Sequence, residues 1–356
     1  MSDKQKKPEI SWFGALCDDD YEFLGVAAPE LRSSWEHCRD IVLCAEENGF
    51  DNILLPSGYE LGIDATSFAS AVSVATNRIR LLLAVRMGEM WLPQLARQMA
   101  TIDQMSGGRL TINIISSDLP GQELESEPRY KRTQEYMKVL RDLLNGNPVD
   151  YHGEFVDLEI EAPRVRTVSG HCPPFYFGGF SEAAKETAAM ESDVFLTWPD
   201  TVKGVESTVS DMKERASGRG RELKYGLRAH VIVRESEKEA RDAANRLVSQ
   251  IDDQQGAEIR NRSLDAVSVG VSRQTELREN SDDDGFIEEN LWTGVGRARS
   301  GAGAAIVGDP DQVIKKIDAY MEAGIDAFIL SGYPHISECK LFAANVLKQI
   351  EHGPLI

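Results

Sequence analysis

The chain has 356 residues, of which 42% are apolar and 27% charged, as in an ordinary globular protein. Its formal net charge of −19 argues against nucleic acid and anionic membranes as partners. The N-terminus is polar, and no apolar run reaches the ~18 residues of a membrane span. These features predict a soluble, cytoplasmic protein, and the length allows one large α/β barrel or two domains.

Short apolar strands alternate with amphipathic helices along almost the whole chain. Eight strands are predicted, at residues 11–16, 52–56, 79–86, 110–116, 174–179, 193–198, 226–233 and 327–331. Helices are predicted at 34–48, 65–75, 92–105, 130–144, 181–190, 202–216, 238–254, 310–323 and 338–350. Eight strand–helix units predict a TIM (β/α)8 barrel that forms a single domain over residues 1–356. A doubly wound sheet would alternate similarly, but no GxGxxG follows the first strand.

Two polar segments interrupt this alternation. Residues 118–129 are expected to form a loop after the fourth strand, and residues 252–300 form a long insertion between strands seven and eight. Loops of this length are usually functional lids or disordered segments. The acidic run 281–285 is equally typical of a solvated excursion, whereas apolar residues and glycines return at 290–296. Because these apolar residues and glycines come directly before Arg299, we expect the segment that carries Arg299 to form a lid.

The cysteines and histidines do not predict a metal site or disulfides. The five cysteines are odd in number and include no CxxC, so neither a disulfide framework nor a zinc site is indicated. No HxH, HExxH or carboxylate cluster with metal-ligand spacing occurs, and we expect no metal.

Cationic side chains occur in segments that otherwise have the composition of buried structure. Arg228 and His230 are two residues apart on the seventh strand, so both should point into the barrel. Both lie early in this apolar run, although barrel chemistry takes place at the carboxyl ends of strands. Because isolated cations are costly to bury, these residues and Arg299 predict a pocket for an anion. The alternative is that the arginines pair with some of the 58 acidic residues.

Three aromatic or imidazole side chains are placed at strand ends. Tyr333 and His335 follow the eighth strand, at the expected catalytic face, and Trp198 ends the sixth strand, where it could form the wall of a pocket. A structural turn at Tyr333–His335 and a core position for Trp198 remain alternatives.

A second group of residues suits a phosphate. Gly178 and Gly179 lead from the fifth strand to Ser181 at a helix N-terminus, where backbone N–H groups and the helix dipole attract anions. A simple N-cap is the alternative for Ser181. On the fourth strand, Asn113 and Ser116 are polar where branched apolar residues are expected, and Tyr130 begins the next helix.

Several of these motifs together resemble the flavin-dependent alkanesulfonate monooxygenases of the bacterial luciferase-like group. The resemblance covers nearly the whole chain and includes the long insertion. Its most specific parts are Gly226-Leu227-Arg228-Ala229-His230-Val231-Ile232-Val233-Arg234-Glu235 and Leu330-Ser331-Gly332-Tyr333-Pro334-His335. It is also carried by Tyr176-Phe177-Gly178-Gly179, Leu196-Thr197-Trp198, Asn290-Leu291-Trp292, Gly294-Val295-Gly296, Gly301-Ala302-Gly303 and Val307-Gly308-Asp309.

The resemblance implies a two-component reaction on a TIM barrel. A separate NAD(P)H-dependent flavin reductase would supply reduced FMN (FMNH2), and the chain would use it with O2 to cleave a carbon–sulfur bond, giving an aldehyde and sulfite. Arg228, His230, Arg299 and Tyr333 match the family's sulfonate and catalytic positions, and Trp198 and His335 complete the expected substrate site. The expected FMN site comprises Asn113, Ser116, Tyr130, Gly178, Gly179 and Ser181. The resemblance also implies a homodimer or homotetramer.

Two loops depart from the family pattern. A histidine that is typical after strand one is replaced by Leu16-Cys17-Asp18-Asp19-Asp20-Tyr21, and a cysteine-containing loop after strand two is replaced by residues 57–64. The added Asp, Glu and Tyr side chains, among them Asp18, Glu60 and Asp64, could bind hydroxyl groups. We therefore expect a polyhydroxylated sulfonate such as sulfoquinovose, rather than a simple alkanesulfonate, as the substrate.

Two other functions remain open at the level of the sequence. The chain could be a luciferase-like monooxygenase that acts on a non-sulfonate such as a sulfone, although Arg228 and Arg299 would then lack an anionic partner. It could also be a non-catalytic flavin-binding protein, which would have little need for His230 and Tyr333.

Overall fold

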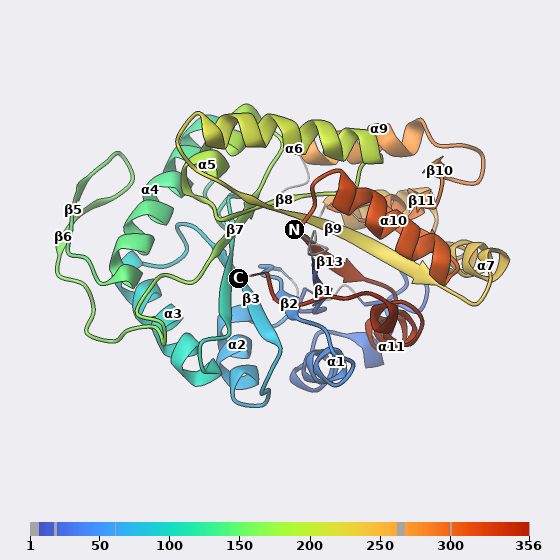
Figure 1. Cartoon of the computed structure of the whole chain (residues 1–356), viewed down its shortest axis with the longest axis horizontal. Helices are drawn as coiled ribbons and strands as arrows, with labels where there is room; N and C mark the ends of the chain where they lie inside the picture. Colours follow the sequence, from blue (N-terminus) through green and yellow to red (C-terminus); the bar gives the residue numbers. More distant parts are fainter. Residues whose placement is uncertain (1–6, 18–19, 61, 262–267, 300, 356) are drawn as a thin grey trace, which may run out of the picture.

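The computed structural model describes residues 7–17, 20–60, 62–261, 268–299 and 301–355 (Figure 1). Eight parallel strands close into a barrel, in the order β1, β2, β3, β4, β7, β8, β9, β13 and back to β1. Their bounds are β1 (Glu9–Phe13), β2 (Asn52–Leu55), β3 (Arg80–Arg86), β4 (Leu110–Ile115), β7 (Phe175–Gly178), β8 (Val194–Thr197), β9 (Lys224–Val233) and β13 (Ala327–Ser331). These are the eight strands that the sequence predicts, so the TIM-barrel prediction is confirmed.

Helices surround the barrel (Figure 1). They are α1 (Trp35–Glu47), α2 (Ala65–Ser73), α3 (Leu92–Ser106), α4 (Ser126–Asn145), α5 (Glu182–Glu191), α6 (Val202–Ser217), α7 (Glu237–Leu247), α10 (Pro310–Glu322) and α11 (His335–Asn345), with short 3-10 turns η1 (Pro29–Leu31) and η3 (Leu347–Gln349). The main apolar core lies between helices and strands and includes Leu227, Ala229 and Val231 of β9. These alternate with Arg228 and His230, which therefore face the barrel interior.

The predicted bounds of three helices were wrong by several residues. Helix α4 begins at Ser126, four residues early, because Pro128 is tolerated in a first helical turn. Helix α7 ends at Leu247 rather than 254, since tertiary hydrogen bonds from Leu24 and Arg297 use the carbonyls of Leu247 and Ile251. Helix α11 begins at His335 and ends at Asn345.

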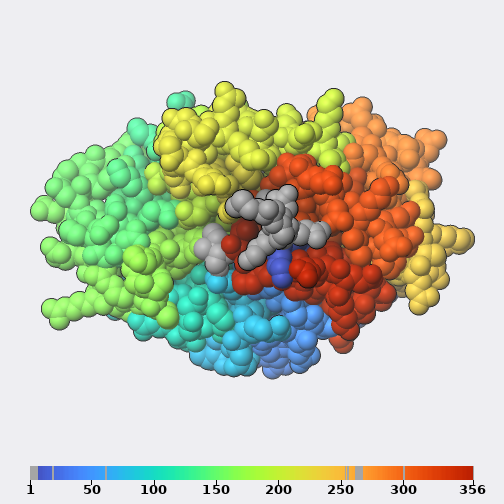
Figure 2. Space-filling view, in the orientation of Figure 1, coloured from blue at the N-terminus to red at the C-terminus, as the bar shows by residue number. Residues whose placement is uncertain are grey.

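A β-hairpin that the sequence analysis did not predict separates α4 from β7. Strands β5 (Val149–His152) and β6 (Asp157–Ile160) pair in antiparallel register outside the barrel. The carboxylate of Glu135 on α4 accepts hydrogen bonds from three consecutive backbone amides, those of residues 154–156, in the hairpin turn. In the space-filling view, the green segment around this hairpin and the yellow-to-orange segment from α7 to β11 form opposite ends of an elongated molecule (Figure 2).

The predicted insertion at 252–300 contains regular structure in its described part. It holds α8 (Asp253–Asn261), α9 (Val269–Glu279), β10 (Phe286–Glu288), β11 (Leu291–Trp292) and η2 (Gly294–Arg297), and β12 (Ala305–Gly308) follows it. The acidic run is a turn in which Asp282 Oδ1 accepts hydrogen bonds from the amides of Asp284 and Phe286. The expectation of a single polar loop was therefore wrong for this segment, which forms two helices and a small antiparallel ladder.

Strand β9 pairs with two strands of the barrel and also with a strand outside it. Its first half pairs with β8 and β13, and the register of β13 ends where Ser331 lies opposite His230. From His230 to Val233 it pairs in parallel with β12, to which β11 and β10 are added in antiparallel. Arg228 and His230 therefore lie in the middle of β9 and yet at the carboxyl end of the barrel, because the strand continues beyond the barrel to Val233.

The amino end of the barrel is closed by an acidic network. The Oε1 atom of Glu9 accepts hydrogen bonds from Ser11, Asn52 and Tyr176, and its Oε2 atom accepts one from the amide of Leu355. The C-terminal segment thus lies against the start of β1, where Gly353 N also donates to Pro8 O at 3.1 Å.

Candidate active site

The aromatic ring of Phe13 brings the two expected sulfonate-binding arginines together. Phe13 ends β1, and the guanidinium carbons of Arg228 and Arg299 lie 4.3 Å and 6.0 Å from its ring centroid. Arg228 comes from β9, whereas Arg299 follows η2, so segments that are far apart in the sequence meet at this ring. Two neighbouring guanidinium groups repel each other unless an anion lies between them.

His230 lies beside this pair and is almost completely buried. Its Nδ1 atom lies 2.8 Å from Ser331 Oγ, which also accepts a hydrogen bond of 2.8 Å from Arg228 Nη2. Burial, and then the charges of Arg228, Arg299 and His335, lower the pKa of His230 well below its usual range. The imidazole is therefore neutral, and it stacks on the ring of Tyr333 at a centroid distance of 5.2 Å.

Tyr333 and His335 belong to the same cluster of rings. Tyr333 packs edge-on against His335 at 5.2 Å and against Tyr21 at 5.6 Å, and the His335 ring lies 6.0 Å from that of Phe13. His335 is fully buried, at the first turn of α11. The structure thus brings Arg228, His230, Arg299, Tyr333 and His335 together, as the sequence analysis expected.

Asp20, which the sequence analysis placed only among possible hydroxyl-binding acids, is buried beneath these rings. Its carboxylate accepts hydrogen bonds from the backbone amide of His335 at 3.0 Å and from the Nε2 atom of His37, on α1, at 2.7 Å. Burial acts to raise the pKa of Asp20, but the charge and hydrogen bonds of His335 and the bond from His37 lower it overall. Asp20 therefore anchors the start of α11 and does not face solvent.

The predicted cofactor residues line one cavity of about 300 Å³ at the carboxyl end of the barrel. They lie on β4, at the N-terminus of α4 and in the turn from β7 to α5: Asn113, Ser116, Tyr130, Gly178, Gly179 and Ser181. Trp198 and Arg228 also line it, so Arg228 connects the cavity to the cluster around Phe13.

The two glycines of this cavity are required first by protein packing. A Cβ atom on Gly178 would lie 2.0 Å from the carbonyl oxygen of Leu196, on the neighbouring strand. A Cβ atom on Gly179 would lie 2.5 Å from that of Ala184 and 3.2 Å from the Tyr130 hydroxyl. The glycines thereby let the N-terminus of α5 pack close to β8 and α4, and so define the cavity wall.

Ser181 caps α5 and faces the cavity at the same time. Its Oγ atom accepts a hydrogen bond of 3.2 Å from the amide of Ala184, so the N-cap alternative describes a real contact. Its position in the cavity lining leaves the expected contact with a phosphate as a prediction.

Arg129 is a cavity residue that the sequence analysis missed, because residues 118–129 were predicted to be a loop. It lies in the first turns of α4, where a cation is disfavoured by the helix dipole. Its contact with Asp118 is long, at 3.4 Å, and its buried Nε atom has no hydrogen-bond partner among the residues that the structure describes. A cation in this position would have been a usable sign of an anion site.

The insertion covers the cavity. Ser268, Val269 and Gly270, at the start of α9, contribute to its lining. A Cβ atom on Gly270 would lie 2.7 Å from the Trp198 ring, which itself packs on Phe180 at 5.8 Å. Gly301 also lies close to Trp198. Trp198 is therefore enclosed by α9 on one side and by the segment that carries Arg299 on the other.

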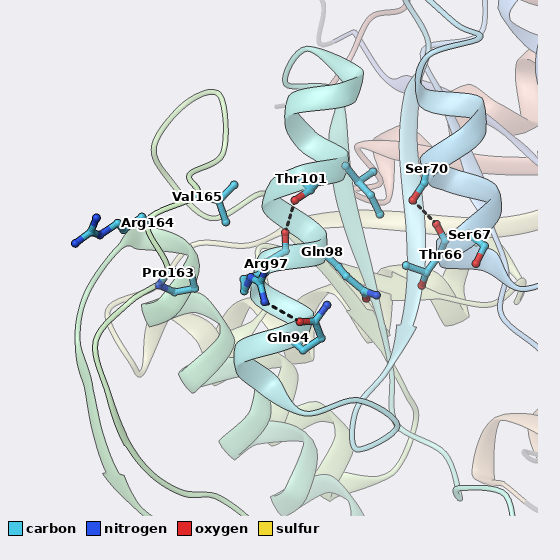
Figure 3. Close-up of a pocket in the computed structure, with 11 residues that line it drawn as sticks. Thr66, Ser67, Ser70, Gln94, Arg97, Gln98, Thr101, Pro163, Arg164 and Val165 are labelled. Carbon is cyan, nitrogen blue, oxygen red and sulfur yellow. Dashed lines mark hydrogen bonds between the residues drawn. The ribbon is translucent and has the colours of Figure 1, made fainter.

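Another hollow, of about 510 Å³, lies outside the barrel between α2, α3 and the segment after β6 (Figure 3). Three of its polar side chains are bonded within their own helices: Ser70 donates to Thr66 O, Thr101 to Arg97 O, and Arg97 to Gln94 Oε1. Because no set of polar groups converges on its interior, this hollow is not a candidate active site.

Within the described ranges, no three or more His, Cys, Asp and Glu side chains are grouped so that they could hold a metal ion. Across the same residues, no helix combines the length and the apolar character needed to cross a membrane.

Comparisons with known proteins agree with this architecture. The chain is 60% identical over 354 residues to a sulfoquinovose monooxygenase of Novosphingobium aromaticivorans, covering 98% of both chains. It is 49% identical over 346 residues to a sulfoquinovose monooxygenase of Agrobacterium fabrum, covering 96% of this chain and 90% of the relative.

Among solved structures, riboflavin lyase, crystallised with modified FMN and riboflavin, superposes with a TM-score of 0.79. This superposition covers 99% of this chain and 94% of the lyase at 14% identity, which supports the fold alone. The profile of the luciferase-like monooxygenases matches residues 22–327. The chain is therefore an oxidoreductase that belongs to the luciferase-like monooxygenase family.

Proposed function

We propose that this protein is an FMNH2-dependent monooxygenase that cleaves the carbon–sulfur bond of sulfoquinovose and releases sulfite and an aldehyde. The observation that carries the proposal is the convergence of Arg228, Arg299 and His230 beside Phe13, next to a cavity of about 300 Å³. The two sulfoquinovose monooxygenases at 60% and 49% identity support the choice of substrate.

The cluster has the chemistry to bind a sulfonate. Guanidinium groups offer forked donors that can hold two oxygens at once, and Arg228 and Arg299 approach from two different segments. His230, Tyr333 and His335 surround the same place, and Trp198 closes the side toward the cavity. A sulfonate here would offset the repulsion between the guanidinium groups, which a neutral sulfone would not do.

The cavity fits FMN. The N-termini of α4 and α5 both reach it, and Tyr130, Ser181 and Arg129 would hold the phosphate. The buried Nε atom of Arg129, without a partner among the described residues, is the observation that favours an anion at this end. Asn113 and Ser116 would contact the remainder of the cofactor from β4. When bound, FMNH2 would supply the electrons that activate O2 for the oxygenation.

The cover formed by α9 and the Arg299 segment would keep water from the reacting groups. Water exclusion matters because reduced flavin and O2 otherwise yield hydrogen peroxide instead of product. Arg299 would couple substrate binding to this cover, since it lies on the covering segment and beside Arg228 at the same ring.

The loop acids do not explain a preference for a hydroxylated substrate. Glu60 is exposed, and Asp64 is exposed and accepts the capping hydrogen bond from the amide of Ser67 at the start of α2. Asp20 is engaged with His37 and His335, and Asp18 lies outside the described residues. The proposal of sulfoquinovose therefore depends on the relatives and not on the acids that first suggested it.

The proposed reaction needs a separate NAD(P)H-dependent flavin reductase as a partner, because the resemblance to the two-component alkanesulfonate monooxygenases implies that the chain uses flavin reduced elsewhere. We further propose that the protein assembles as a homodimer or homotetramer, which light scattering of the purified protein would establish.

Sulfite release tests the proposed function directly. The purified protein would be supplied with a flavin reductase, NADH, FMN and O2, and with either sulfoquinovose or hexanesulfonate under the same flavin supply. We expect sulfite from sulfoquinovose with the higher kcat/KM, and none when the reductase is omitted. Absence of sulfite from every sulfonate would refute the function, whereas a preference for hexanesulfonate would refute only the substrate.

A further inference from the structure

We propose that Ser331 fixes His230 as the neutral tautomer that carries its proton on Nε2, so that His230 acts as a hydrogen-bond donor in the site and not as a base. The inference rests on the proposed function and deepens it by assigning a direction to each hydrogen bond of the sulfonate cluster. Ser331 is thereby a positioning residue, which acts through His230.

The contacts form a short chain across two neighbouring strands. In the register of β13 with β9, Ile329 lies opposite Arg228 and Ser331 lies opposite His230. Arg228 Nη2 lies 2.8 Å from Ser331 Oγ, and Ser331 Oγ lies 2.8 Å from His230 Nδ1. Ser331 is fully buried and His230 is 1% exposed.

The positions of the protons follow from the donor and acceptor capacities of these groups. A guanidinium group only donates, so Ser331 Oγ accepts from Arg228 and keeps a single proton to donate. A buried hydroxyl proton needs an acceptor, and among the described residues the acceptor at Ser331 Oγ is His230 Nδ1. A neutral imidazole that accepts at Nδ1 carries its proton on Nε2.

The two other protonation states of His230 are disfavoured. If Nδ1 donated to Ser331, the buried hydroxyl would receive two hydrogen bonds and have no described acceptor for its own proton. A doubly protonated ring is opposed by burial and by the charges of Arg228 and Arg299, which lower the pKa of His230. The Nε2–H tautomer is the neutral state in which the hydroxyl of Ser331 has both a donor, Arg228, and an acceptor, His230.

The Nε2 atom faces the site. It makes no hydrogen bond of good geometry to a described residue, but a weaker hydrogen bond between the ring and the backbone of Ala302, in the covering segment, acts to raise the pKa of His230. A backbone carbonyl only accepts, so this contact also calls for a proton on the ring nitrogen. With Arg228 and Arg299, an Nε2–H group completes a set of donors, and sulfonate oxygens only accept. The set therefore selects an acceptor-only anion, and it leaves no lone pair on His230 to remove a proton from substrate.

Nuclear magnetic resonance of the resting, full-length protein labelled with 15N-histidine tests the tautomer without flavin or substrate. The chain has six histidines, so the His230 signals are identified by their loss in His230→Gln. We expect an unprotonated Nδ1 and a protonated Nε2. An unprotonated Nε2 in the parent protein would overturn the inference, whatever the outcome of the sulfite assay.

Variants of Ser331 test whether this residue fixes the tautomer of His230. Ser331→Thr keeps the hydroxyl and should keep the tautomer, whereas Ser331→Ala should give a mixture of the two neutral forms. Ser117→Ala is a matched control, because Ser117 is fully buried and accepts a hydrogen bond of 2.7 Å from Arg86 without contacting a histidine. It should leave the His230 signals unchanged, and a parent-like tautomer in Ser331→Ala would refute the role of Ser331.

Kinetics separate positioning from a general loss of structure. Ser331→Ala should raise KM for sulfoquinovose about tenfold and lower kcat by a smaller factor. A factor of about two is expected because one in two rings would present a lone pair to the sulfonate, and the remainder because Arg228 loses the hydroxyl that orients it. Ser331→Thr should restore KM to within about threefold of the parent value. Equal losses in both variants would indicate a packing defect and contradict the proposal.

Discussion

Glu9 and His230 are both buried inside the barrel, Glu9 at its amino end and His230 at its carboxyl end. Both oxygens of Glu9 accept hydrogen bonds, from Ser11, Asn52, Tyr176 and the amide of Leu355. His230 uses Nδ1 within the protein and leaves Nε2 without a well-formed bond to a described residue. At the amino end the buried carboxyl group is satisfied by the chain itself, whereas at the carboxyl end Arg228 and Arg299 meet at one ring beside a buried imidazole nitrogen that lacks a well-formed bond, an arrangement that suits an anion.

The largest effect is expected from replacing an arginine at the carboxyl end of the barrel, with an arginine at the amino end replaced as the control. Arg228→Met should lower kcat/KM for sulfite release by a factor on the order of 10²–10³, because a buried charge-assisted contact to the sulfonate is lost. Its melting temperature should change little, since repulsion with Arg299 is lost together with the hydrogen bonds of Arg228.

Arg109→Met is the matched variant at the amino end. Arg109 donates to the carbonyls of Ser73, Thr76, Ile79 and Ser106. The Arg109→Met variant should have a lower melting temperature than the parent protein, and its kcat/KM should stay within about twofold of the parent value. If the two arginines affected activity equally, the distinction between the ends would be wrong.

Glu9→Gln should destabilise the protein by about 1–3 kcal/mol, because an amide donor would replace one acceptor that faces only donors. Burial is the largest influence on the pKa of Glu9 and raises it, although hydrogen bonds from Leu355, Asn52 and Tyr176 oppose this. A raised folded-state pKa contributes stability below the unfolded value of 4.5 that is lost as pH rises through the folded-state pKa.

Urea denaturation at several pH values above 4.5 therefore measures this prediction. The parent should lose part of its advantage over Glu9→Gln as the pH increases, while kcat for sulfite release stays equal in the two proteins. An advantage that grows with pH would contradict the assigned direction of the pKa shift.

Arg299→Ala should change the products more than the stability. Without Arg299 the covering segment loses its contact with bound sulfonate, so water and O2 should divert more reduced flavin to hydrogen peroxide. We expect the sulfite-to-peroxide ratio to fall about tenfold under matched flavin supply. A ratio equal to that of the parent would show that Arg299 does not couple the cover to the substrate.

The smallest effect is expected from replacing Ser181, and this variant distinguishes helix capping from ligand binding. Ser181→Ala removes the cap of α5 and, if the phosphate lies there, should weaken reduced-FMN binding about threefold to tenfold in anaerobic titration. Ser236→Ala is the control, because Ser236 caps α7 by the same contact and does not line the cavity. Both variants should lose about 1 kcal/mol of stability, but the control should bind FMNH2 as the parent does.

The barrel was predictable because each of its strands is an apolar run bounded by polar turns and followed by an amphipathic helix. Arg228 and His230 were recognisable for a related reason, since cations at alternate positions of an apolar strand have no packing explanation. Arg299, Tyr333 and His335 were first selected from their place in the chain, and the resemblance to the family then gave them roles in substrate binding.

What the sequence did not reveal depends on tertiary contacts. Strand β12 is only four residues long and follows a glycine-rich stretch, so its pairing with β9 left no local pattern. The burial of Asp20 depends on His37 and His335, which lie 17 and 315 residues away. Arg129 was hidden because the first turn of α4 is as polar as a loop.

The continuation of β9 beyond the barrel gives the insertion a fixed end, which is separate from the helices that cover the cavity. Ala305 is in register with His230, and Val307 exchanges hydrogen bonds with buried Asn290, so the end of the insertion is fixed to the catalytic strand. Helices α8 and α9 lie upstream of that anchor. Both helices also hold the segment that leads to Arg299, because Arg260 of α8 and Arg278 of α9 donate to the carbonyls of Arg297 and Gly296. A graft of new substrate preferences would therefore have to exchange α8, α9 and η2 together, while the pairing of β12 with β9 stays in place.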